Sequence, residues 1–228
     1  MNSMVPISIG DDCAVANIIN ENSIGNSIGN SIGSSIGFLP FDWCTTKYLS
    51  VIADILESDF EILRDWSKFY IDNTKIYDKY TYVDDGDCDS ESSKNNMLYW
   101  NVSGVIDTTK SIKFPHDIRS EHSNTDFELF KQKMERRISR LKSIDIENRI
   151  FYRYENNYTR NITKTNLEKI LKHCKVLKIW LNPNEHKKMF NSVDYNYVKS
   201  LIESGRLDIN IDANWQNHEG WKKKLVLF

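Results

Sequence analysis

Paired cysteines and long apolar runs are missing from this chain, and no secretory leader is expected. Its four cysteines, Cys13, Cys44, Cys88 and Cys174, are widely spaced and form no CxxC pair, which argues against a zinc site and against a disulfide scaffold. No apolar run approaches the roughly 18 residues that a membrane span needs. The sequence does not begin with the basic segment and apolar stretch that would predict a secretory signal. We therefore expect a cytoplasmic protein that uses no membrane and no metal or organic cofactor.

A strong net charge is also lacking. The formal net charge of −2 and the isoelectric point near 6.2 give no reason to expect a nucleic-acid partner. Hydrophobic residues make up 40% of the 228 positions and aromatic residues 12%, which is typical of a folded globular protein. A chain of this length supports one sizeable core, so the sequence predicts a single domain over residues 1–228.

Two segments depart from this globular composition. Residues 22–37 repeat a tetrapeptide, NSIG three times and then SSIG, and a period of four with a glycine in each unit fits neither an amphipathic helix nor a sustained strand. Replication slippage that lengthened a surface loop explains the repeat best, since long loops cost little extra closure entropy. A contact with a partner protein is the alternative. Residues 84–96 are acidic and rich in serine, and they predict a second loop.

Strand and helix signals alternate along much of the chain. Apolar or alternating runs predict strands at 5–9, 149–154, 175–181 and 207–211, and helices are expected over 46–57 and from about 125, 165 and 195 onward. Such alternation implies an α/β fold in which helices flank a mostly parallel sheet. The middle of the chain, apart from a strand over 75–83, is predicted to be rich in loops.

Two of the helices have clear start signals. Thr125 and Glu128 have the spacing of a capping box, as do Thr165 and Glu168. The first of these helices also combines an apolar stripe with a basic run over 133–142. The stripe consists of Phe127, Phe130, Met134, Ile138 and Leu141, and the basic residues are Lys133, Arg136, Arg137, Arg140 and Lys142. A charge run of this kind is usually a solvated helix face, and binding of a phosphate, a nucleic acid or a protein partner is the alternative.

Cys13 is the strongest candidate for chemistry. It follows the predicted strand and a turn that begins at Gly10, and it precedes the apolar stretch 14–19, which predicts the start of a helix. A turn of this kind exposes the sulfur, and a helix N-terminus favours thiolate over thiol. The alternative is a small core residue. Asp11 and Asp12 would raise the pKa of the thiol unless one of them caps the helix.

A cysteine nucleophile needs a base that takes its proton and returns it to the leaving group. Histidine does both near neutral pH, and His116 follows Pro115, which favours an extended or turn conformation around it. A third group has to orient the imidazole. Asp117, Asp42 and Asp212 are open alternatives for that role.

Four short motifs follow one another along the first two thirds of the chain. They are ISIGDDCAVA at 7–16, PFDW at 40–43, FPHD at 114–117 and RRISR at 136–140. In this order they resemble the DUF1796 group, whose members are predicted to be papain-like cysteine peptidases and occur in bacteria, eukaryotes and large viruses. The resemblance implies that Cys13 and His116 form a catalytic pair with Asp42 or Asp117 as helper. It also offers a papain-like α+β fold as the alternative architecture and, for a viral protein, the host cytoplasm or the virion as location.

These residues together predict a thiol hydrolase or acyltransferase that is similar to a cysteine peptidase and acts on a peptide, an amide or an ester. Two other classes remain open. One is a binding protein that keeps the fold without turnover and contacts a partner through residues 133–142 or 22–37. The other is an α/β enzyme in which the turn after Ile9 binds a phosphorylated or sugar substrate. The lack of a Walker lysine or a GxGxxG motif after the first strand disfavours that enzyme.

Overall fold

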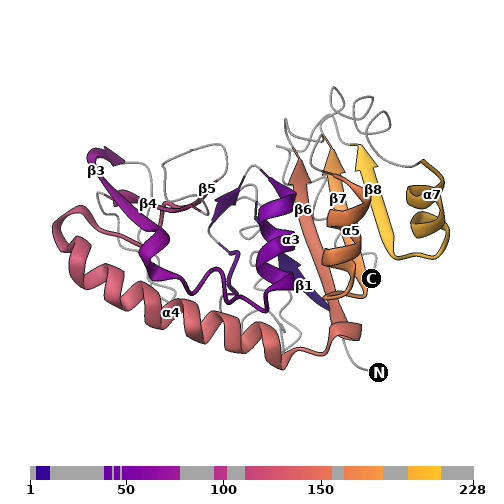
Figure 1. Ribbon diagram of the computed structural model, residues 1–228, viewed down its shortest axis with the longest axis horizontal. Coiled ribbons are helices and arrows are strands. Elements are labelled where there is room, and N and C mark those ends of the chain that lie inside the picture. The colour runs from indigo at the N-terminus through magenta and orange to yellow at the C-terminus, as the bar shows by residue number, and fades with distance from the viewer. Residues whose placement is uncertain are drawn as a thin grey trace, which may run out of the picture.

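The computed structural model describes residues 4–10, 39–42, 44–46, 48–77, 95–101, 111–155, 162–181 and 195–211. These residues form two sheets that lie side by side, sheet A and sheet B (Figure 1). Sheet A is parallel, with the strand order β1 (Val5–Ser8), β6 (Arg149–Glu155), β7 (Val176–Leu181), β8 (Leu207–Ile211). Sheet B is antiparallel, with the order β2 (Thr45–Thr46), β5 (Ser111–Phe114), β4 (Asn95–Asn101), β3 (Phe69–Tyr77). The helices are α3 (Leu49–Glu57), α4 (Ser123–Ser143), α5 (Lys164–Leu171) and α7 (Tyr195–Glu203).

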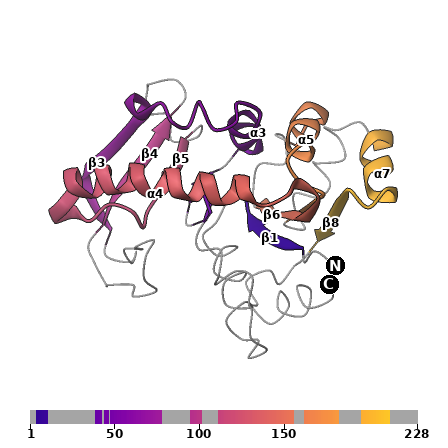
Figure 2. The ribbon, with the colours of Figure 1, turned by 90° about the horizontal axis from the view of Figure 1, so that it is seen from below.

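Sheet A confirms the predicted parallel sheet. Helix α5 connects β6 to β7 and α7 connects β7 to β8, and each pair of neighbouring strands is parallel. Helices α3, α5 and α7 cover one face, where α3 packs against α5 (Figure 2). Phe151, Leu177 and Ile179 belong to the core beneath these helices, whereas Tyr152 and Trp180 belong to a second, smaller cluster. Because side chains alternate between the two faces of a strand, each of these strands places its side chains in two different clusters.

Sheet B was not predicted, and it replaces much of the loop-rich middle. The strand expected over 75–83 begins earlier, because β3 starts at Phe69, and residues 78–83 lie outside the described part of the chain. Asn95 and Asn96 belong to β4, while the rest of the predicted acidic loop and the whole repeat at 22–37 also lie outside it. The protein is therefore broadly α/β, with an antiparallel sheet beside the parallel one.

Helix α4 ties the two sheets together. It runs along sheet B and ends beside the start of β6 (Figures 1 and 2). Its Phe130 ring meets the rings of Phe69 in β3 and Phe114 in β5, with centroid distances of 5.4 and 5.0 Å. Further along the helix, Ile138 and Leu141 are fully buried in the core that both sheets share. The predicted apolar stripe is thus the buried face of α4.

The predicted capping boxes are both wrong, because each helix begins before the predicted cap. Helix α4 begins two residues before Thr125, and its N-cap residue, His122, forms no side-chain capping bond. Helix α5 begins one residue before Thr165, and its N-cap is Thr163, whose hydroxyl accepts a bond of 3.2 Å from the Asn166 N–H. A serine or threonine cap acts from just outside the helix, so a shift of two or three residues changes which side chain satisfies the free N–H groups.

A tight turn ends helix α3. Asp59 and Phe60 have positive φ values of 52° and 70°. The Phe60 N–H donates to the Ile55 carbonyl at 2.9 Å, and the Asp59 N–H donates to the Leu56 carbonyl at 3.0 Å. This is the Schellman arrangement, in which a left-handed residue satisfies the last carbonyls of a helix. The position usually holds glycine, so the turn is under backbone strain here.

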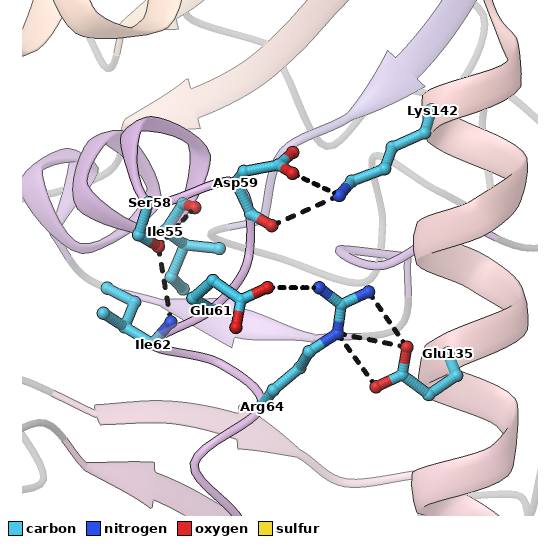
Figure 3. Close-up of polar contacts among 8 residues, drawn as sticks. All are labelled: Ile55, Ser58, Asp59, Glu61, Ile62, Arg64, Glu135 and Lys142. Atoms are coloured by element: carbon cyan, nitrogen blue, oxygen red, sulfur yellow. Dashed lines mark hydrogen bonds and ion pairs between the residues drawn. The ribbon is translucent and has the colours of Figure 1, made fainter.

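Ion pairs hold this turn against α4 (Figure 3). The Arg64 guanidinium donates to both carboxylate oxygens of Glu135 at 3.0–3.1 Å and to Glu61 at 2.8 Å. The Lys142 ammonium lies 2.5 Å from an oxygen of the Asp59 carboxylate. The hydrogen bonds that Arg64 donates to Glu135 raise the pKa of Arg64. These contacts involve the exposed side of α4, so its opposite side remains available for the core.

Candidate active site

His116 and Asp117 lie in the turn that follows β5. Phe114 ends that strand with its ring fully buried, and Pro115 begins the turn. Asp117 is fully buried, whereas His116 is 9% exposed. His116 therefore lies at the margin of the core, with its Nε2 atom buried.

Asp117 is held by two cations of α4. The Lys133 ammonium lies 3.0 Å and the Arg137 guanidinium 3.5 Å from the same carboxylate oxygen, and both cations are almost completely buried. Burial alone would raise the pKa of Asp117, but the positive charges of Lys133 and Arg137 outweigh it, so the pKa lies below its ordinary value. The carboxylate is consequently ionised at neutral pH and committed to these partners.

This arrangement corrects the prediction that residues 133–142 form a solvated basic face. Lys133 and Arg137 point into the protein. Arg136 is exposed and Arg140 is partly exposed, while Lys142 pairs with Asp59. The basic run is therefore divided between two sides of the helix, which weakens the hypothesis that it binds a partner as one surface.

Asp42 lies just before β2, the strand that pairs with β5. It is 7% exposed, and its carboxylate accepts a bond of 2.8 Å from the Leu39 N–H. Thr45 of β2 is the register partner of Lys113 of β5. Asp42 lies three residues before Thr45, and His116 three residues after Lys113. Both segments thus leave the same end of the β2–β5 ladder.

The carboxyl end of β1 approaches sheet B at Gly10. This glycine has a φ of 77°, and a Cβ placed on it would lie 2.9 Å from the Thr46 Cγ2 and 3.3 Å from the Cys44 Sγ. Only a residue without a side chain fits this contact without displacing its neighbours. Cys13 follows three residues later and lies outside the described residues, as does Asp212. Carboxyl ends of parallel strands are the usual place for ligand sites in α/β proteins.

Two other cysteines, Cys44 and Cys174, are buried in the core. Cys44 is fully buried, and its thiol donates to the Phe41 carbonyl at 3.1 Å. Cys174 is fully buried as well, and burial raises the pKa of its thiol to about 12. A thiol of this kind is almost entirely protonated at neutral pH and is chemically inert.

Two features of this region were not predicted from the sequence: the role of Arg153 and the buried position of the cations that bind Asp117. Arg153 is fully buried in β6 and donates to the Ile9 and Thr46 carbonyls. An arginine between Tyr152 and Tyr154, in the middle of a predicted strand, was the available signal. For Lys133 and Arg137, the signal was their helical spacing from Phe130, which places all three on one face.

The chain matches no known family model, no curated protein and no solved structure. The resemblance to the DUF1796 group therefore stays a prediction. Among the described residues, no three histidine, cysteine or acidic side chains come together as a metal site would require. No helix within the same residues is both long and apolar enough to cross a membrane.

Proposed function

We propose that the protein is a thiol-dependent hydrolase or acyltransferase, similar to cysteine peptidases, in which Cys13 is the nucleophile and His116 the base. One observation carries the proposal. The segment that leads to Cys13 leaves sheet A against Thr46 of β2, and His116 follows β5, the strand that pairs with β2. Each residue extends a chain by at most about 3.6 Å, so the Cα atom of Cys13 lies within about 11 Å of that of Gly10.

The surroundings of His116 suit a general base. His116 is largely buried in the turn after β5, so its ring exchanges protons with groups packed beside it and not with bulk water. Asp117 is engaged by Lys133 and Arg137, so it serves to anchor the turn. Asp42 is then the stronger candidate to orient the ring, because its segment leaves the same end of the ladder.

In the proposed reaction, His116 takes the proton from the Cys13 thiol and the thiolate attacks the carbonyl carbon of a peptide, amide or ester. The N–H groups of Cys13 and Ala14 stabilise the oxyanion that forms. The bond to the leaving group breaks as the imidazolium returns the proton to it, which leaves a thioester on Cys13. Water or another acceptor, deprotonated by His116, then attacks the thioester and regenerates the thiol.

The test is the pH dependence of alkylation at Cys13. Iodoacetamide labelling, read by mass spectrometry of the peptide that contains Cys13, is compared in the wild type, His116→Ala and His122→Ala. His122 is an exposed histidine at the start of α4, so its variant controls for the loss of any histidine. Cys174 serves as the unreactive internal standard because it is buried.

We expect the wild-type midpoint to lie well below the roughly 8.5 of a free thiol, and to rise toward that value only in His116→Ala. A wild-type midpoint near 8.5 that neither variant changes would remove the activated pair and with it the proposed function.

A further inference from the structure

Arg153 is a charged side chain in an unusual place. It lies in β6 next to Tyr152 and Tyr154, and none of its surface is exposed. Moving a guanidinium from water into a protein interior costs several kcal/mol unless hydrogen bonds compensate. A residue of this kind therefore has contacts that the fold depends on.

Its contacts join the two sheets. One terminal nitrogen donates to the Ile9 carbonyl at 3.2 Å and the other to the Thr46 carbonyl at 3.1 Å. Ile9 follows the last residue of β1 in sheet A, and Thr46 is the last residue of β2 in sheet B. Arginine suits this bridge because its rigid fork holds two donors apart, whereas lysine offers a single point of attachment.

The bridge acts where Gly10 touches sheet B. The same guanidinium lies 4.0 Å from the position that a Cβ of Gly10 would take. On one side of the bridge the chain continues from Gly10 to Cys13. On the other side, Thr46 pairs with Ile112 of β5, and β5 leads to His116.

We propose that Arg153 is a positioning residue that sets the separation of Cys13 and His116 by fastening the carboxyl end of β1 to strand β2. The role rests on the proposed function for its chemical consequence, but the placement itself can be measured separately. Without the guanidinium, the Ile9 and Thr46 carbonyls lose donors, and the sheets lose a direct link beside Gly10.

Proximity is measured with 1,3-dibromoacetone at about pH 9, where an ordinary thiol is ionised. The Cys13 sulfur displaces one bromide, and a His116 ring nitrogen displaces the other and loses a proton, so a three-carbon bridge joins the two side chains. Peptide mapping by mass spectrometry gives the bridged fraction. The variants are Arg153→Met and Arg153→Lys, and circular dichroism verifies that they fold.

Arg149→Met is the matched control. Arg149 lies at the other end of β6, is also buried, and donates to the Ile144 carbonyl at 2.6 and 2.8 Å. Its loss removes a comparable buried guanidinium far from Gly10 along the strand. We expect a bridge in the wild type and in Arg149→Met, a severalfold smaller bridged fraction in Arg153→Met, and an intermediate one in Arg153→Lys.

The alkylation midpoint of Cys13 should also rise by roughly one pH unit or more in Arg153→Met, and not in Arg149→Met. Wild-type bridging in both Arg153 variants, or no bridge in the wild type, would overturn the inference. Unfolding of both Arg153 variants while Arg149→Met stays folded would overturn it as well. A wild type that bridges but has an ordinary thiol would remove the proposed function and leave the placement by Arg153 intact.

Discussion

Sheet A and sheet B are stabilised by different means. The core beneath the helices of sheet A is largely aliphatic, with Ile7, Leu177 and Ile179 beside Phe151. Sheet B meets α4 through the rings of Phe69, Phe114 and Phe130. The buried charges of Asp117, Lys133 and Arg137 follow along the same helix.

The difference teaches where the fold is tolerant and where it is not. Aliphatic packing is not directional, so conservative changes of similar volume are tolerated in such a core. A buried ion pair requires all of its members, because a charge left without its partner keeps its full desolvation cost. The candidate site lies on the ionic side of this comparison, since His116 is the residue before Asp117.

The largest expected effect is the loss of the buried carboxylate. Asp117→Asn should destabilise the protein by about 3–5 kcal/mol at neutral pH, because the buried cations Lys133 and Arg137 lose the carboxylate that faces them. The folded pKa of Asp117 lies below its ordinary value of 3.8. The stabilisation is therefore complete above that value and is lost as the pH falls through the folded pKa. Urea unfolding at a series of pH values measures the free energy of unfolding of both proteins.

Leu177→Ala is the control for that prediction in sheet A. Leu177 is fully buried in β7. Its truncation should lower the free energy of unfolding by about 2–5 kcal/mol, and this loss should not change with pH. If the cost of Asp117→Asn is equally independent of pH down to about 3, the carboxylate does not stabilise the fold through its charge.

A smaller effect is expected where the sheets touch. Gly10→Ala places a methyl group 2.9 Å from the Thr46 Cγ2 at a φ of 77°, and should cost about 1–3 kcal/mol. Gly205→Ala is its match, with a φ of 71° and nothing within 4 Å, and should cost about 1 kcal/mol. Thermal and urea unfolding measure both. Equal costs would mean that the contact between β1 and β2 is loose.

The smallest effect belongs to the exposed side of α4. Glu135→Gln removes the carboxylate that Arg64 contacts with two nitrogens, and should cost about 0.2–1 kcal/mol. The cost should fall as salt is added, because the pair is partly exposed. Glu128→Gln, at an exposed i,i+3 pair with Lys131 on the same helix, is the control and should cost less. A loss of several kcal/mol from Glu135→Gln would place the turn after α3 among the essential contacts.

Sheet A was predictable because its signals are local. The alternation of Leu207, Ile209 and Ile211 and the apolar run of β7 are visible within a few residues of sequence. Sheet B depends on distant pairing. Its strand β2 has two residues, and Thr45 pairs with Lys113. No short window of sequence contains both partners.

The residues proposed for the site were chosen from the sequence by residue type, but the cations that contact Asp117 were not predicted. Rules for charge runs count residues without assigning them to a helix face, so Lys133 and Arg137 were predicted to face solvent. Position on the helix decides, because both share the face of Phe130. Arg153 was missed for a related reason: its strand was recognised, but its role depends on a second sheet that the sequence did not reveal.

The most direct test of the proposed function is the distance between the Cys13 sulfur and the nearer ring nitrogen of His116 in a crystal structure of the wild-type protein. We predict that it is within about 4 Å, close enough for proton transfer. Cys13 packed in the core, or separated from His116 by other buried side chains, would contradict the proposal and make the cysteine a packing residue.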